Sequence, residues 1–102
     1  MLDFIQQHRE DLSELCRQYS VRRLDLFGSA VKKTFNPESS DLDFLVVFRR
    51  GESIDVTEQY FGLLSSLEIL FHRKIDLVDV RAHRNPYFMA EALKHREMVY
   101  VA

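Results

Sequence analysis

The chain is 102 residues long, and its 46% apolar and 29% charged residues are typical of a globular fold rather than a disordered segment. This length favours a single domain, which we expect to span residues 1–102. The net charge of −2 argues against binding of nucleic acid by bulk electrostatic attraction. We therefore expect no direct nucleic-acid partner.

Several features of the sequence bear on the cellular compartment. Cys16 is the only cysteine, so an internal disulfide is excluded and a reducing compartment fits best. Asp3, His8 and Arg9 stand where a signal peptide needs an apolar core. No window approaches the roughly eighteen apolar residues that mark a membrane span. We expect a cytoplasmic protein without a membrane partner.

The first half of the sequence predicts a helix, a strand, a brief helix and a second strand. Apolar residues recur at helical spacing over residues 3–18. Residues 21–27 are short and apolar and are ended by Gly28, which predicts a strand. A brief helix is expected over residues 29–33. After a cluster of turn residues, residues 42–48 are apolar at both parities, as in a central strand covered on both faces.

The second half contains two helices that begin at recognisable N-caps. Asp55 precedes the clearest apolar stripe in the chain, and Asn85 is followed by a proline at the first helical position. Helices and strands alternate here over residues 56–71, 75–80, 86–95 and 98–101. The interleaved order along the whole chain predicts an α/β sandwich.

Asp41 and Asp43 are the first candidate site residues. Positions i and i+2 of a strand point to the same face, roughly 6.5–7 Å apart at Cα. Two carboxylates in this arrangement suit Mg²⁺, a hard cation that prefers oxygen ligands. Aspartate is rare in strands, and here two aspartates open a very apolar one. Taken alone, the pair is also explained as a polar start to the strand near the surface.

Gly28 and Ser29 form a turn between the first strand and the brief helix. Glycine lets the backbone approach a ligand closely, and the amides and the Ser29 hydroxyl can bind phosphate oxygens. Lys32 and Lys33 follow within the same stretch and add positive charge for a triphosphate. A Gly-Ser turn alone is weak evidence for a phosphate site. Together with the aspartate pair on a neighbouring strand, it predicts a combined phosphate and metal site.

A third carboxylate is expected for phosphoryl transfer with two metal ions. The strand over residues 75–80 offers Asp76 and Asp79. Because these residues have opposite parity, only one of them can face the site. Spacing alone does not choose between them.

The stretch FGSAVKKTFNPESSDLDFLV resembles the signature of minimal nucleotidyltransferases in the DNA polymerase beta superfamily. That signature is Gly-Ser, about ten residues, Asp-x-Asp and a later aspartate on a following strand. The resemblance implies the nucleotidyltransferase fold of class α/β (α+β), a small mixed β-sheet flanked by helices. It implies that Gly28 and Ser29 hold phosphate, with Asp41, Asp43 and Asp76 as catalytic metal ligands.

Two positions depart from the family pattern. Eleven residues, rather than ten, separate Ser29 from Asp41. Ala30 stands where many relatives have arginine, so Lys32 or Lys33 must supply the positive charge for the nucleotide. Neither departure removes an expected ligand of the two Mg²⁺ ions.

The resemblance also implies a reaction and a partner. Stand-alone proteins of this kind are similar to antitoxins that add AMP from ATP to a tyrosine of a HEPN-domain ribonuclease toxin. The expected activity is therefore that of a Mg²⁺-dependent protein adenylyltransferase acting within a hetero-oligomer with the toxin. Two alternatives stay open: an antitoxin that neutralises by binding alone, and a nucleotidyltransferase that modifies a small molecule.

Overall fold

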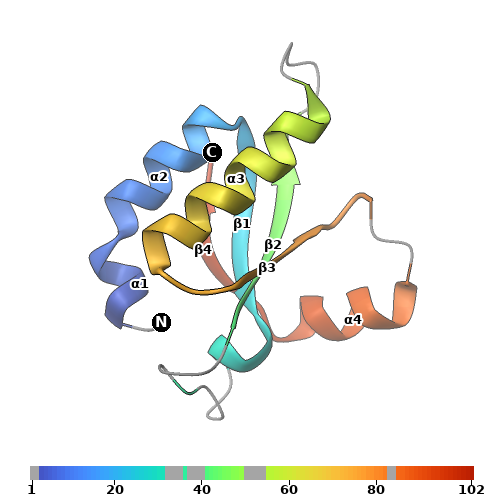
Figure 1. The fold of residues 1–102 in the computed structure, drawn as a ribbon. Coiled ribbons are helices and arrows are strands. Elements are labelled where there is room, and N and C mark those ends of the chain that lie inside the picture. The colour runs from blue at the N-terminus through green and yellow to red at the C-terminus, as the bar shows by residue number, and fades with distance from the viewer. Residues whose placement is uncertain (1–2, 32–35, 37–40, 50–54, 83–84) are drawn as a thin grey trace.

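The computed structural model describes residues 3–31, 36, 41–49, 55–82 and 85–102. Helices and strands alternate along most of this part of the chain (Figure 1). In chain order the elements are α1 (Asp3–Gln7), α2 (Arg9–Gln18), β1 (Val21–Phe27), η1 (Gly28–Val31), β2 (Leu42–Phe48), α3 (Val56–Phe71), β3 (Ile75–Asp79), α4 (Pro86–Lys94) and β4 (Glu97–Val101).

The predicted order of elements is confirmed, with differences at their ends. The first helix is divided at His8, whose φ of −102° and ψ of 18° interrupt the helical path. The brief helix is a 3-10 helix, η1, and positions 32–33 of that prediction lie outside the described residues. β3 ends one residue early because the Asp79 carboxylate accepts a hydrogen bond from the Arg81 amide at 3.0 Å, which forms a turn.

The four strands form one mixed sheet in the order β3-β2-β1-β4. β1 is antiparallel to both β2 and β4, whereas β2 is parallel to β3. This arrangement confirms the expected α/β (α+β) class with a small mixed sheet. β1 and β2 are the two central strands, so the strand that ends just before Gly28 and the strand that contains Asp43 are direct neighbours.

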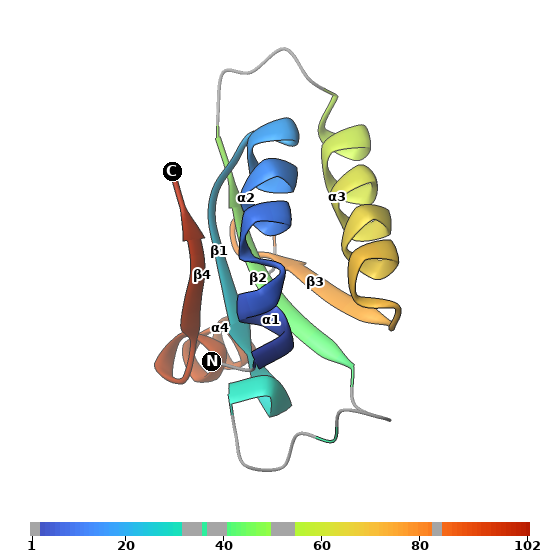
Figure 2. The same cartoon turned by 90° about the vertical axis from the view of Figure 1, so that its left-hand side faces the viewer.

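One face of the sheet is covered by α1, α2 and α3 (Figures 1 and 2). The apolar side chains of this helix-covered face form the main core, which includes Leu12, Leu24, Phe44, Leu63 and Leu67, each no more than 1% exposed. Cys16, the single cysteine, is fully buried in this core. The apolar residues of the helices and those of the strands thus lie together in one layer between them.

The opposite face is covered at one end by α4 (Figure 2). Met89 and Ala92 of α4 pack with Phe27 and Leu45 of the central strands in a second, smaller apolar cluster. β2 is therefore covered on both faces, with Phe44 in the main core and Leu45 in this second cluster, as its apolar sequence predicts. We refer to this side of the sheet as the α4 face.

Side-chain caps fix where the two later helices begin. The Asp55 carboxylate accepts hydrogen bonds from the amides of Thr57 and Glu58, at 2.8 and 3.1 Å. Asn85 caps α4 in the same way. Both N-caps were predicted, and both satisfy amides that the first turn leaves without helical partners.

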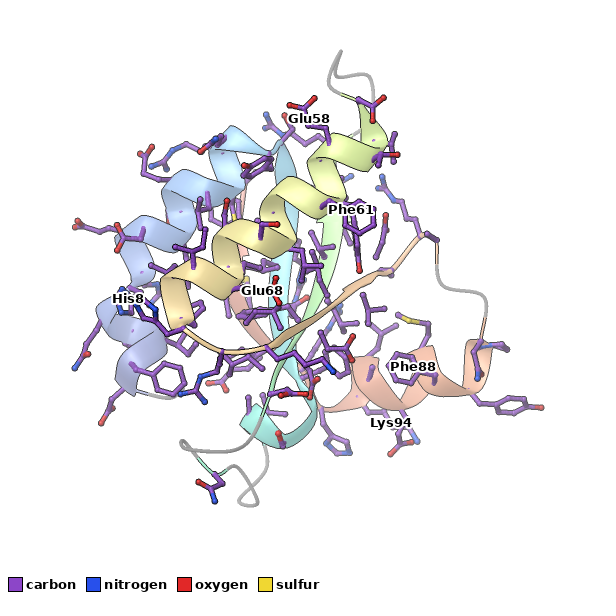
Figure 3. The ribbon with its side chains drawn as sticks, in the orientation of Figure 1. His8, Glu58, Phe61, Glu68, Phe88 and Lys94 are labelled. Carbon is purple, nitrogen blue, oxygen red and sulfur yellow. The ribbon has the colours of Figure 1, made fainter. Side chains whose placement is uncertain are left out.

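The outer edge of β3 is partly closed by α3. The Tyr60 hydroxyl donates a hydrogen bond to the Leu77 carbonyl oxygen. Phe61 also projects from α3 in the direction of β3 (Figure 3). Edge strands with free backbone groups invite pairing with other chains, and this contact occupies one such group. In the part of the chain that is described, no helix is both long and apolar enough to cross a membrane.

Candidate active site

Asp43 lies beside the Gly-Ser turn because of the register between β1 and β2. Phe27 pairs with Asp43, so Gly28 follows directly at the end of β1. Gly28 has a φ of +68°, and a Cβ atom built on it would lie 2.3 Å from the Asp43 Oδ2 atom. The backbone of Ser29 donates a hydrogen bond to the same carboxylate. Glycine is thus required here for both its conformation and its lack of a side chain.

Asp76 is brought to the site by the parallel pairing of β2 with β3. It is the register partner of Asp43. Asp79 instead pairs with Val46, further along the strand, and its carboxylate binds the Arg81 amide. The structure therefore places Asp76 beside Asp43 and Asp79 away from it, a distinction that the spacing of the two aspartates did not provide.

Asp41 lies just before β2, and its side chain is exposed. Its charge and that of Asp76 both act on Asp43. The three predicted carboxylates are thus gathered at one end of the central strands, next to Gly28 and Ser29. Lys32 and Lys33, the other predicted nucleotide-binding residues, lie outside the described residues.

The ionised form of Asp43 is disfavoured by its surroundings. Burial is the largest cause, followed by repulsion from Asp76 and then from Asp41, and together they raise the pKa of Asp43 to about 6. The hydrogen bond from the Ser29 amide acts in the opposite direction. A bound cation would offset each of the effects that raise this pKa.

The donor set suits a magnesium ion. Carboxylate oxygens are the preferred ligands of this hard cation, and the close approach of Gly28 holds one carboxylate in place. Among the described residues, the acidic, histidine and cysteine side chains do not form a ready-made cluster of three metal ligands. The chemistry of Asp41, Asp43 and Asp76 therefore fits the ion, and binding would draw their oxygens together.

Asp25 is a buried carboxylate whose environment was not predicted from the sequence. It is 2% exposed on β1, and Arg23 Nε lies 2.9–3.0 Å from its two oxygens. Arg96 Nη1 lies 3.6 Å from Oδ2. The available signal was the i, i+2 spacing of Arg23 and Asp25, which places both on one face of the strand. Its charge is balanced within the fold, so Asp25 is a structural rather than a metal-binding residue.

The sequence matches the family model described as Polymerase beta, Nucleotidyltransferase over residues 10–102. The match covers most of the chain, which therefore belongs to the polymerase beta nucleotidyltransferase family. No curated protein matches the chain. Family membership and the observed sheet agree with the resemblance stated from the Gly-Ser and Asp-x-Asp motifs.

Solved structures give the same fold. A protein described as a minimal nucleotidyltransferase is 28% identical, with a TM-score of 0.74 over 93% of this chain and 94% of that chain. A chain from a toxin-antitoxin structure with AMP-PNP is 20% identical, with a TM-score of 0.68 over 92% of this chain and 73% of that one. Another comes from the tri-AMPylated Shewanella oneidensis HEPN toxin in complex with MNT antitoxin, at 18% identity and a TM-score of 0.66 over 96% and 73%.

Proposed function

We propose that this chain is an antitoxin that transfers AMP from ATP to a hydroxyl group, that of a tyrosine, on a partner HEPN ribonuclease toxin. The observation that carries the proposal is the gathering of Asp41, Asp43 and Asp76 beside the Gly28–Ser29 turn. One end of the sheet thereby combines oxygen ligands for Mg²⁺ with the Gly28 amide and the Ser29 hydroxyl for phosphate.

Each residue at this end has a distinct role in the proposed reaction. The Gly28 amide and the Ser29 hydroxyl bind phosphate oxygens of ATP, while the Ser29 amide stays bonded to the Asp43 carboxylate. The acceptor oxygen attacks the α-phosphorus, its proton passes to Asp76, and the bond to the β-phosphate breaks to release pyrophosphate. Asp41 and Asp43, with Asp76, would hold Mg²⁺, which supplies charge neutralisation on the triphosphate. Alignment of the reacting groups provides the remaining acceleration.

The proposed acceptor follows from the relatives. Structures with this fold include antitoxins in complex with HEPN toxins, and in one of these complexes the toxin is tri-AMPylated. An acceptor group supplied by a docked protein implies a hetero-oligomer during the reaction.

A matched pair of variants on β3 tests the assignment. Asp76→Asn removes the proposed base and ligand, and Asp79→Asn makes the same change three residues away, where the side chain can still accept from Arg81. With labelled ATP, Mg²⁺ and a purified HEPN-domain protein, we expect Asp76→Asn to lower label transfer by at least about 100-fold. Asp79→Asn should transfer label at nearly the wild-type rate.

The same assay separates the competing functions. Equal loss of transfer in the two variants would contradict the role given to Asp76. A tight complex that inactivates the HEPN protein without labelling it would show an antitoxin that acts by binding alone. Label recovered only on a small molecule would show a different acceptor class. Intact circular dichroism spectra of both variants are the folding control.

A further inference from the structure

A small pocket lies between the end of β1 and α4, next to Gly28. Its volume is about 180 Å³, and its lining residues are Phe27, Gly28, Phe88, Glu91, Ala92 and His95. Pockets that hold a whole drug-sized ligand usually measure about 300 Å³ or more. This pocket therefore has room for one ring system of a larger ligand.

Gly28 links this pocket to the proposed reaction site. The glycine forms part of the pocket wall, and it also lies against the Asp43 carboxylate. A ligand in the pocket is thus separated from Asp43 by a single residue that has no side chain. A molecule with one end in the pocket can place its other end on the Gly28–Ser29 turn.

The pocket walls suit a flat aromatic group. The rings of Phe27 and Phe88 meet edge to face, with centroids 5.8 Å apart and an interplanar angle of 86°. Ala92, which is 8% exposed, keeps the space between α4 and β1 open. Glu91 and His95 are exposed and add polar groups at the rim. Apolar faces with a few polar groups at the rim are the usual way in which proteins bind a nucleobase.

We propose that this pocket binds the purine base of the nucleoside triphosphate whose phosphates lie on the Gly28–Ser29 turn. The proposal rests on the proposed function and adds the base subsite to it. A purine offers a large face for stacking, and the Glu91 carboxylate can accept a hydrogen bond from the exocyclic amine of adenine. Phe88 and Ala92 determine the width of the space that the base enters.

The strand order argues against the acceptor side chain as the occupant. Asp76 lies on β3 and the pocket lies beside β1, so the two flank Asp43 of β2 on opposite sides. An acceptor hydroxyl next to Asp76 approaches from the β3 side. The pocket is thus left to the nucleotide.

Filling the pocket tests this subsite without touching the carboxylates. Ala92→Leu narrows the space, and Ala90→Leu makes the same change at an exposed position of α4 that does not line the pocket. Isothermal titration measures binding of ATP and of inorganic tripolyphosphate, each with Mg²⁺. We expect Ala92→Leu to weaken ATP binding by about tenfold or more, and tripolyphosphate binding by no more than about twofold. Ala90→Leu should change neither.

Different results separate this inference from the proposed function. If Ala92→Leu weakens both ligands equally, or weakens neither, the base subsite is wrong while the phosphate site stands. If the wild-type protein binds neither ATP nor tripolyphosphate, the proposed function fails and the subsite fails with it. Should Ala92→Leu not fold, Phe88→Leu decides the question, because it removes the stacking face but keeps apolar bulk; the same selective loss of ATP binding is then expected.

Discussion

Phe44 and Asp43 are neighbours on β2, and they point to opposite faces of the sheet. Phe44 is fully buried in the core under α1, α2 and α3, and its ring packs against Phe71 with centroids 6.2 Å apart. Asp43 is half-buried on the α4 face, with the charges of Asp41 and Asp76 nearby. One side of the strand therefore contributes to stability, and the other holds carboxylates close together at a cost in stability.

The α4 face contains two partly or fully buried carboxylates that differ in their partners. Asp25 has Arg23 and Arg96 within 3.6 Å of its oxygens. Asp43 has two acidic neighbours and one backbone amide from Ser29. Burial of a charge is tolerated when a partner compensates it. The fold supplies that compensation for Asp25 but not for Asp43, where the proposed function assigns it to a bound cation.

The largest expected effect on stability is on the helix-covered face. Phe44→Ala removes a fully buried ring, and we expect it to lower the free energy of unfolding by about 3–5 kcal/mol. Urea denaturation followed by circular dichroism measures this loss. A loss below about 1 kcal/mol would contradict the contrast between the two faces, since this is the cost of a single buried methylene.

A smaller effect is expected where α2 meets α3. A Cβ atom on Gly62 would lie 2.4 Å from the Tyr19 ring, although alanine is favoured over glycine within a helix by about 1 kcal/mol. Overpacking costs about 1–3 kcal/mol, so Gly62→Ala should be destabilising by about 1 kcal/mol net. Thermal denaturation measures the change.

The Tyr19→Ala background provides the control for Gly62. With the ring removed, the clash disappears and helix propensity remains, so Gly62→Ala should then be stabilising. The same loss in both backgrounds would show that contact with Tyr19 does not explain the glycine.

Local patterns were sufficient to predict most of the fold. The 3.6-residue stripe and the Asp55 cap predicted α3, and the continuous apolar run predicted β2 as a central strand. The division at His8 was not predicted, because the apolar spacing continues through it. Sequence periodicity reports which side of an element is buried, but it does not report small changes in the backbone path.

The sequence could group the candidate site residues only where they lie close together along the chain. Parity limited the third carboxylate to Asp76 or Asp79, and only the register with β2 placed Asp76 opposite Asp43. The pocket could not be predicted, because Phe27 and Phe88 come from elements about sixty positions apart and meet only through the packing of α4 on the sheet. Pairing register and tertiary packing are properties of the folded chain.

The last predicted effect tests whether Asp43 costs stability. Its pKa is raised from 3.8 to about 6 in the folded protein, so the folded state binds this proton more tightly than the unfolded state does. The proton's contribution to stability is full below pH 3.8 and is lost as the pH rises through about 6. Because asparagine does not ionise, the Asp43→Asn variant does not lose this stability as the pH rises. Because water screens a half-exposed carboxylate, we expect the variant to be more stable by about 1 kcal/mol at pH 7.5 without divalent cations.

The difference between wild type and Asp43→Asn, measured by urea denaturation from pH 4 to 7.5, isolates this carboxylate because other titrating groups largely cancel. We expect the difference to grow as the pH rises and to shrink when Mg²⁺ is added, since the cation stabilises the ionised wild-type site.

Asp25→Asn serves as the contrast: it should be destabilising at pH 7.5, because Arg23 and Arg96 lose their charged partner. Added Mg²⁺ should change stability only in proteins that keep the Asp43 carboxylate, which are the wild type and Asp25→Asn. A pH-independent difference for Asp43→Asn would contradict the view that its charge is uncompensated by the fold.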